Sequence, residues 1–382
     1  MTHTKSEVAI SSLPTGSPDS FDIGFPRNLL PLLRCIRDSG ELRLCRETRS
    51  GRVGVIEGTL RCLKCSAEYA IQNGVARLMA ETLTEETAHE IELKDSEYEA
   101  LPDDFEAPSS GWRSQYADGI EIPPHLEELA PLDGCKVLEL GCGDGRFTML
   151  MAQLGAEILA VDVSFEAVRK LARRLPSGIA PTTYRINSQN VGQDLSGRVG
   201  LVQADASNFR AASRSFDRAL SATPLDSRDE RMSMYRAVAE ALTDEGRYVA
   251  GVEHDDLSRR LLGMPSVKRY TPGGIFVEHL TGQQLKNETA PYFSRLRVRF
   301  IRVHAPLLKH LPAGFAVRVA LTLARIPLLR LLGELVLVSA ERPVRPPVEG
   351  LRRAGSAAAK GLYRCYKRLK RQEPIWDPGE KV

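Results

Sequence analysis

The sequence predicts a doubly wound α/β fold, with a mostly parallel sheet of seven strands and a small β domain ahead of it. Three observations support this prediction. From residue 134 onward, short apolar segments alternate with amphipathic segments of helical period. A glycine-rich turn, ELGCGDG, includes the end of the first apolar segment. Four of the seven cysteines lie earlier, in a compact unit over residues 28–80.

The elements of the sheet domain follow in order. The expected strands are CKVLEL, EILAVDVS, RVGLVQADA, FDRALSAT and RYVAGVEH, and the expected helices include RFTMLMAQLG, FEAVRKLARRL and DERMSMYRAVAEALTDEG. Strands that alternate with helices of this length form βαβ units, which build a parallel sheet. Two final strands, SRLRVRFIRV and GELVLVSAER, flank a helical insertion near residues 305–330.

Composition divides the remaining chain. Residues 1–27 are polar with scattered Pro, Gly and Ser, which predicts a disordered leader. Residues 81–111 form an acidic linker with one helix, and residues 112–343 hold the sheet domain. Residues 344–382 are a basic tail whose segment 351–372 contains no acidic residue. This tail is a candidate for binding anionic lipid or RNA, although a solvated helix is the favoured alternative.

The overall composition, 42% apolar and 26% charged, is typical of a soluble globular protein. The formal net charge of +3 is too small to indicate a nucleic-acid partner by itself. The cysteines are odd in number and unevenly spaced, which argues against a disulfide framework. The first residues lack the apolar core of a secretory signal, so we expect cytoplasmic residence.

The turn after the first strand is the most informative motif. Gly141, Gly143 and Gly145 let the backbone approach a ligand closely, and the helix that follows begins with unpaired amide groups. A dinucleotide fingerprint would need glycine at the position of Arg146, which argues against a nicotinamide cofactor. The plain alternative is a tight strand-to-helix turn without a ligand.

Acidic side chains surround this turn. Glu139 and Asp144 would repel a pyrophosphate and suit a ligand with hydroxyls and a positive charge. Asp162 ends the second strand, where it can accept hydrogen bonds from two ribose hydroxyls, and Asp205 ends the third, within reach of an adenine amino group. The alternatives are a solvated strand end for Asp162 and a helix N-cap for Asp205.

This pattern resembles the class I S-adenosylmethionine-dependent methyltransferases, whose sheet is Rossmann-like. ELGCGDG is similar to the family's glycine loop, VDVS to its ribose-binding strand end and QADA to its adenine contact. The resemblance is close over residues 134–251 and looser as far as residue 343. It implies that S-adenosylmethionine is the cofactor, held by the following residues: Glu139, Gly141, Cys142, Gly143, Asp144, Gly145, Asp162, Val163, Asp205, Ala206 and Ser221.

Methyl transfer asks for alignment of the acceptor and, for a hydroxyl acceptor, for a base. His254 follows the fifth strand and His279 lies in GGIFVEHLT, so both are candidate bases, with a structural role as the favoured alternative for each alone. Tyr116 is a candidate cap over the cofactor and equally a packing residue. The fourth strand ends in SATP, unlike the Asn/Asp-Pro-Pro-aromatic tetrad of resembling nucleobase amine methyltransferases. This lowers the expectation of a nucleic-acid substrate without excluding it.

The cysteine unit contains a C-x2-C knuckle, Cys62 and Cys65, and upstream Cys35 is followed at the same interval by Asp38. Two such knuckles are typical of a zinc ribbon. The segment resembles the small zinc-ribbon domain that activates tRNA methyltransferases. Cys45 is an alternative fourth ligand, and a ribbon without metal is nearly as well supported. In either case we expect a module that docks or presents substrate.

The predicted helix in the insertion has Arg318 and Arg325 on one face. It could lie on a membrane surface or cover an apolar substrate. The favoured alternative is an insertion that packs on the sheet or on a second subunit.

Taken together, the sequence predicts an S-adenosylmethionine-dependent methyltransferase for a small-molecule or lipid-like acceptor, acting at oxygen, with peripheral membrane contact left open. One alternative is an RNA or protein methyltransferase that docks its substrate on the ribbon and the basic tail. Another is a non-catalytic Rossmann-like binding module.

Overall fold

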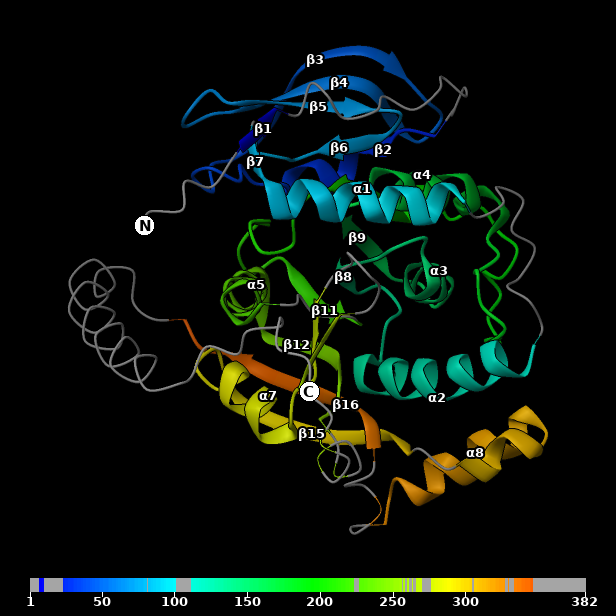
Figure 1. Cartoon of the computed structure of the whole chain (residues 1–382). Helices are drawn as coiled ribbons and strands as arrows, with labels where there is room; N and C mark the ends of the chain where they lie inside the picture. Colours follow the sequence, from blue (N-terminus) through cyan, green and yellow to red (C-terminus); the bar gives the residue numbers. More distant parts are fainter. Residues whose placement is uncertain are drawn as a thin grey trace, which may run out of the picture. The chain divides into compact units, whose positions relative to one another are not determined.

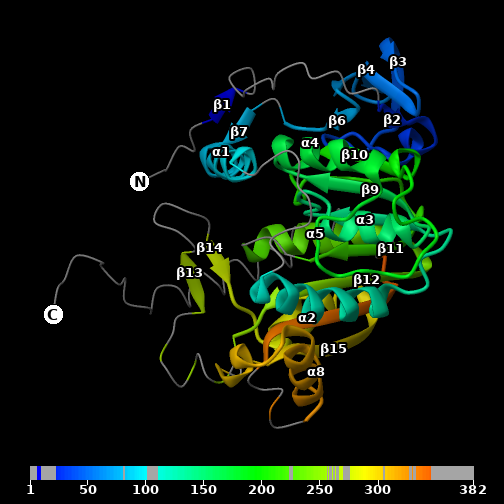
Figure 2. The same cartoon turned by 90° about the vertical axis from the view of Figure 1, so that its right-hand side faces the viewer.

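A twelve-stranded mixed sheet runs through the part of the chain that the structure describes (Figures 1 and 2). The computed structural model describes residues 7–9, 23–80, 82–100, 111–222, 227–255, 257, 260, 263, 266–269, 276–303, 306–326, 329 and 333–345. The strands of this sheet are β2 (Phe25–Pro26), β3 (Leu42–Ser50), β4 (Gly54–Cys62), β5 (Glu68–Gln72), β6 (Val75–Arg77), β8 (Lys136–Leu140), β9 (Glu157–Asp162), β10 (Val199–Gln203), β11 (Phe216–Ser221), β12 (Leu242–Glu253), β15 (Phe293–Val303) and β16 (Gly333–Pro343). The α-helices discussed below are α1 (Glu85–Glu99), α2 (Trp112–Leu129), α3 (Arg146–Gln153), α4 (Phe165–Arg174), α5 (Arg228–Ala241), α7 (Gly282–Thr289) and α8 (Ala313–Leu323).

The centre of the sheet is parallel. Its strands lie in the order β15, β16, β12, β11, β8, β9, β10. Strands β10, β9, β8, β11 and β12 are parallel to one another, whereas β16 runs antiparallel between β12 and β15. The strands expected from residue 134 onward are therefore confirmed. The chain passes from β8 to β9 on one side and later returns to β11 on the other, so the strand order reverses at β8. Ligands of open α/β sheets bind outside the carboxyl ends of the strands at such a reversal.

The sheet is wider than the seven strands that the sequence predicted. Strand β6 pairs in parallel with β10, with Val75 opposite Leu201 and Arg77 opposite Gln203. Strands β5, β4, β3 and β2 then continue the sheet beyond β6. One hydrophobic cluster runs through both parts. The strands within residues 25–77 thus extend the main sheet and share its core.

Alternating side chains give the sheet two covered faces. Val137 and Ile158 belong to a cluster formed with α2, α3 and α4, whereas Leu138 and Leu159 belong to one formed with α5 and α7. Neighbouring residues on a strand point to opposite faces, so apolar runs of this kind need helices on both sides. This is the doubly wound arrangement that the sequence predicted.

A buried ion cluster fixes α7 beside α5. Arg231 of α5 is 1% exposed, and it contacts Glu288 of α7 at 3.0 Å and Glu278 of β14 (Phe276–Glu278) at 2.7 Å. Removing one partner of a buried pair leaves an uncompensated charge, which is strongly destabilising. The segment from β14 to α7 therefore has a defined position, and it borders the candidate site described below.

The predicted insertion contains α8, which packs against α2. The indole Nε1 of Trp112 donates a hydrogen bond to the carbonyl of Leu311 at 2.7 Å, and Trp112 stacks on Tyr116 with ring centroids 4.7 Å apart. Tyr116 thus takes the packing role that was its alternative. No helix within the described ranges is both long and apolar enough to cross a bilayer.

The predicted leader and tail lie largely outside the described residues. Within the leader, residues 7–9 form β1, which pairs antiparallel with β7 (Thr82–Thr84). Residues 1–343 form one unit and residues 344–382 another. The basic tail after residue 345 is not among the described residues.

Candidate functional site

The glycine loop, residues 141–145, joins β8 to α3 at the reversal of strand order. Gly141, Gly143 and Gly145 have φ angles of 78°, 53° and 96°, values that side chains rarely tolerate. A Cβ atom at Gly145 would lie 2.3 Å from the Leu171 side chain, and one at Gly143 would lie 2.6 Å from the hydroxyl of Tyr98. The loop therefore needs glycine for two reasons: its φ angles are positive, and neighbouring side chains lie where a Cβ atom would be.

Asp162 ties this loop to the end of β9. Its Oδ2 accepts a hydrogen bond from the amide of Gly143 at 2.8 Å, and its Oδ1 accepts one from the amide of Ser164 at 3.0 Å. Burial raises the pKa of Asp162, and these two amide bonds act in the opposite direction. A carboxylate can accept about four hydrogen bonds, so both oxygens retain acceptor capacity. The predicted ribose-binding residue and the glycine loop thus form one unit.

Two other predicted carboxylates are largely neutralised. Glu139 is buried and accepts a hydrogen bond from the hydroxyl of Thr148 at 2.6 Å. Burial, assisted by the charge of Asp162, raises the pKa of Glu139 to about 8. Asp144 forms an ion pair of 2.5 Å with Arg174 of α4. The negative charge at the loop is therefore smaller than the sequence suggested.

The end of β10 is held by local hydrogen bonds. Asp205 Oδ1 accepts from the amide of Ser207 at 2.8 Å, and its Oδ2 accepts from the side chain of Asn208 at 2.9 Å. Residues 206–208 form a turn and no helix begins there, so Asp205 closes a local turn and is not the helix N-cap that the sequence offered as the alternative. Ala206 follows it as a partly buried residue that packs on the core.

Three further predicted cofactor residues line this edge of the sheet. Cys142 in the loop and Ser221 at the end of β11 are buried. Val163, directly after β9, is half-buried and packs against Met79 and Ile91. Met79 follows β6, so the N-terminal strands bring an apolar side chain to Val163 at the end of β9.

Helix α1 covers the glycine loop, which the sequence did not indicate. Figures 1 and 2 show α1 alongside α4, and the two helices are in contact. Asp95 of α1 accepts hydrogen bonds from the hydroxyl of Ser164 at 2.6 Å and the amide of Glu166 at 3.2 Å. Burial and the nearby charges of Asp162 and Asp144 raise the pKa of Tyr98. Asp95 and Tyr98 are three positions apart, so they lie on the same face of the helix. The acidic sequence of this segment does not show what that face contacts.

Arg146, which occupies the place of the last dinucleotide glycine, has a structural partner. Its guanidinium contacts Asp118 at 2.9 Å and Glu121 at 2.8 Å, both on α2. Asp118 in turn accepts hydrogen bonds from Thr182 and Thr183. This network holds α2 beside the start of α3.

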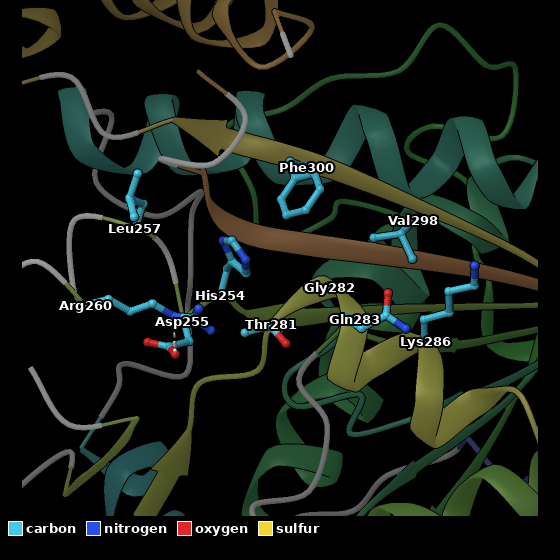
Figure 3. Close-up of a pocket in the computed structure, with 10 residues that line it drawn as sticks. All are labelled: His254, Asp255, Leu257, Arg260, Thr281, Gly282, Gln283, Lys286, Val298 and Phe300. Carbon is cyan, nitrogen blue, oxygen red and sulfur yellow. Dashed lines mark hydrogen bonds and ion pairs between the residues drawn. The ribbon is translucent and has the colours of Figure 1, made fainter. Parts of the chain in front are cut away.

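A second feature of the same sheet edge is a cavity of about 440 Å³ beside His254, called the His254 cavity below (Figure 3). His254 directly follows β12 and is 6% exposed. Its Nδ1 lies 2.5 Å from the carbonyl oxygen of Gly333, so Nδ1 carries the hydrogen and Nε2 is the basic nitrogen. Strand β12 lies two places from β8. Strand spacing and rise place His254 on the order of 15 Å from the glycine loop.

The second predicted base, His279, is engaged on both ring nitrogens. Its Nε2 contacts Glu253 at 3.1 Å and its Nδ1 lies 3.2 Å from the carbonyl oxygen of Ser266. It is not among the residues that line the His254 cavity. Of the two predicted bases, His254 is thus the one found among the described residues that line the cavity.

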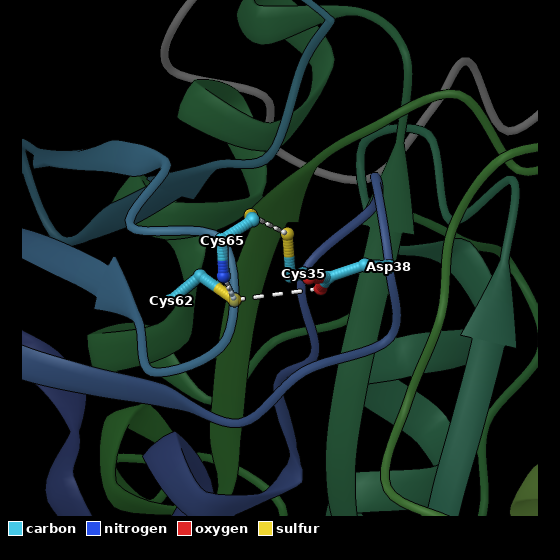
Figure 4. A group of neighbouring side chains, drawn as sticks. All are labelled: Cys35, Asp38, Cys62 and Cys65. Carbon is cyan, nitrogen blue, oxygen red and sulfur yellow. Dashed lines mark hydrogen bonds between the residues drawn. The ribbon is translucent and has the colours of Figure 1, made fainter.

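The predicted metal ligands come together in one cluster (Figure 4). The ligand atoms of Cys35, Asp38, Cys62 and Cys65 all lie within 4.8 Å of one another. The sulfur atoms of Cys35 and Cys65 are 3.6 Å apart. Zn–S bonds of about 2.3 Å in a tetrahedron require a sulfur separation of about 3.8 Å. Cys45 is exposed on β3 and not part of this cluster, so the arrangement fits zinc with Asp38 as the fourth ligand.

Comparison with known proteins gives one family match. A family model described as "Methyltransferase domain" matches residues 137–246, from β8 to the start of β12. Ubiquinone biosynthesis O-methyltransferase of Pseudomonas aeruginosa is 33% identical over 107 residues, which cover 26% of this chain and 46% of that protein. The protein of the same name from Xanthomonas euvesicatoria pv. vesicatoria is 38% identical over 97 residues, 22% of this chain and 39% of that protein. The match thus spans less than half of either relative.

Among solved structures, a putative S-adenosylmethionine-dependent methyltransferase from Listeria monocytogenes covers 60% of this chain and 99% of its own length. Its sequence identity is 18% and its TM-score is 0.41. Likeness at this level carries no argument about function.

The raised pKa of Glu139 predicts a pH-dependent stability. Above about pH 4.5 the unfolded chain loses this proton, whereas the folded chain keeps it up to about pH 8. The free energy of unfolding should therefore fall as the pH rises between these values, by a few kcal/mol in all. Urea unfolding at several pH values should show a shallower fall for Glu139→Gln than for the wild type. Glu245→Gln, at an exposed carboxylate, should keep the wild-type slope, and equal slopes for all three proteins would contradict the assignment.

Proposed function

We propose that the chain is an S-adenosylmethionine-dependent methyltransferase that methylates an oxygen atom of a small-molecule acceptor. The observation that carries the proposal is the Asp162 carboxylate, held against a loop of three left-handed glycines at the reversal of strand order. The match of residues 137–246 to a methyltransferase domain supports the reaction class. The choice of oxygen is supported by the relatives, which are O-methyltransferases by name.

The residues around the glycine loop fit this cofactor. Asp162 has acceptor capacity for ribose hydroxyls, and Val163 with Met79 offers an apolar wall for adenine. Gly141, Gly143 and Cys142 would lie under the methionine part, with Glu139 and Asp144 behind the loop. When bound, S-adenosylmethionine supplies a methyl group on a positively charged sulfur. In this proposal the parallel strands β10, β9, β8, β11 and β12 would form the Rossmann-like centre that carries the cofactor, and the β2–β6 strands would be the ribbon-like unit.

The protein's own task is then to place the acceptor and remove its proton. We assign the acceptor to the His254 cavity, which opens at the same edge of the sheet. Because Nδ1 of His254 is bound to the Gly333 carbonyl, the proton of an acceptor hydroxyl would pass to Nε2. Alignment of the acceptor by the cavity walls would supply the rest.

The second part of the proposal is a structural zinc ion bound by Cys35, Asp38, Cys62 and Cys65. Three thiolates and a carboxylate form a donor set that zinc accepts. The ribbon-like unit would then owe part of its stability to the metal. Its predicted role in docking or presenting substrate stays a prediction.

Contact with a membrane surface, and with it a lipid-like acceptor, rests on α8 alone. This helix exposes Phe315, which is 55% accessible, together with Arg318. An apolar side chain among cations suits the surface of an anionic bilayer. Cytoplasmic residence, with or without such contact, stays a prediction.

The cofactor assignment is tested by isothermal titration calorimetry with S-adenosylmethionine. The folded wild-type chain should bind it, and Asp162→Asn should weaken binding at least about tenfold, because it removes a charge-assisted acceptor. Asp244→Asn, at an exposed carboxylate remote from the loop in sequence, should bind like the wild type. Absence of binding by well-folded wild-type protein would end the proposal.

The choice of base is tested by transfer of a labelled methyl group to fractionated cell extract. His254→Gln should lower the rate by roughly a hundredfold to ten-thousandfold, with cofactor affinity unchanged. His279→Gln changes a residue outside the lining of the cavity and should lower the rate far less. If His279→Gln gave the larger loss of rate, the roles would be reversed.

Metal content is tested by elemental analysis of the purified chain. We expect about one zinc per chain, lost on Cys62→Ser together with a lower unfolding midpoint. Cys45→Ser changes a cysteine outside the cluster and should retain the metal. Metal-free wild-type protein that neither takes up zinc nor gains stability from it would refute the site.

A further inference from the structure

We propose that the His254 cavity takes a planar ring compound that carries one negative charge, with an aromatic hydroxycarboxylate as the simplest case. This inference rests on the proposed function, because it names the class of acceptor for that site. Three features of the cavity support it. One wall is apolar, one lining residue carries a positive charge without a counter-charge among the described lining residues, and this charge lies at the exposed end while His254 lies at the buried end.

The apolar wall is formed by the edge strand β15. Val298 and Phe300 line the cavity, and both are only half-buried although they belong to a strand of the main sheet. The ring of Phe300 meets that of His254 at 4.9 Å in an edge-to-face arrangement (Figure 3). In an edge-to-face pair, the flat face of one ring lies next to the edge of the other. A planar aromatic ligand can stack on such a face, and this favours it over an aliphatic chain. A volume of about 440 Å³ is within the range of small-ligand sites.

The positive charge comes from Lys286 of α7, which Figure 3 places beside Val298. Lys286 makes no ion pair with any residue that the structure describes. Arg260 also lines the cavity, but it forms an ion pair of 3.0 Å with Asp255, so these two charges compensate each other. One positive charge therefore remains among the described lining residues.

Within the described ranges, three carboxylates on the neighbouring elements have other partners. Glu253 at the end of β12 contacts His279 at 3.1 Å. Glu278 of β14 and Glu288 of α7 both contact the buried Arg231. Each is already paired with another group, so none of these three carboxylates competes with an anionic ligand for Lys286. One free ammonium balances a carboxylate, whereas a phosphate dianion would leave negative charge uncompensated.

The two ends of the cavity differ in exposure. His254 is 6% exposed, whereas Lys286 is an exposed residue. A bound hydroxycarboxylate would therefore place its hydroxyl at the buried end, near Nε2 of His254, and its carboxylate at the solvent end. The hydroxyl and the carboxylate should accordingly lie at opposite ends of the ring system.

The test is fluorescence titration of the full chain with 6-hydroxy-2-naphthoate and with its neutral amide, in low salt and without cofactor. The acid should bind roughly threefold to fivefold tighter than the amide, the gain expected of one solvent-accessible ion pair, and added salt should reduce this preference. Lys286→Gln should abolish the preference while leaving amide binding unchanged. Lys136→Gln changes an exposed lysine at the amino end of β8, the opposite edge of the sheet, and should keep the preference.

Equal binding of acid and amide, a preference that survives Lys286→Gln, or no binding of either compound up to its solubility limit would overturn the inference. Calorimetry with S-adenosylmethionine on the same preparation separates the two proposals. A chain that binds the cofactor but fails this titration keeps the proposed activity and loses the acceptor class. A chain that discriminates acid from amide but does not bind the cofactor keeps the anion-selective cavity and loses the activity.

Discussion

The carboxylate of Asp162 is the contact on which the candidate cofactor site depends. It accepts one hydrogen bond from the glycine loop and one from the start of α4, so a single side chain sets the distance between β8, β9 and the two helices that follow them. Helix α4 is capped in the same place by Ser164 and, from another part of the chain, by Asp95. A carboxylate that accepts hydrogen bonds from two backbone amides is both well oriented and costly to replace. This explains how a loop of three glycines, which is entropically expensive to order, has a defined shape.

The parallel strands could be predicted because their signal is local. Each strand from β8 to β12 is an apolar run bounded by turn residues, and the left-handed glycines of the loop have no good substitute. The width of the sheet could not be predicted in the same way. Strand β6 joins β10 through backbone hydrogen bonds, between segments more than 120 residues apart. Such pairing could not be predicted because the side chains of the two segments do not show which strand each will pair with.

The site was predicted less completely than the fold, for a related reason. The sequence shows which residues carry charge but not which partners neutralise it. Asp144 is paired with Arg174, which lies one strand and one helix later, and Glu139 is kept protonated by burial that only the packed structure creates. Two of the three carboxylates that predicted a cationic ligand are thus balanced within the protein, and Asp162 is the one that would remain for it. The sequence predicted one helix in the acidic segment but not its position over the glycine loop, because an acidic composition is typical of a linker. The contacts of α1 there are made by only a few residues, Asp95 and Tyr98 among them.

The two candidate sites share one edge of the sheet but differ in what holds them rigid. Around the glycine loop, backbone amides donate hydrogen bonds to the carboxylates of Asp162 and Asp95, and these bonds hold the loop and the start of α4 in place. Around the His254 cavity it comes from the buried Arg231, which holds β14 and α7 through Glu278 and Glu288 and so fixes the elements that carry Lys286 and frame the cavity. A buried cation of this kind is useful only if both of its carboxylates stay in place, so the same ion cluster that positions α7 also removes two negative charges from the neighbourhood of Lys286. The charge selectivity inferred for the cavity is thus a consequence of how the sheet edge is assembled, and it does not need a separate set of binding residues.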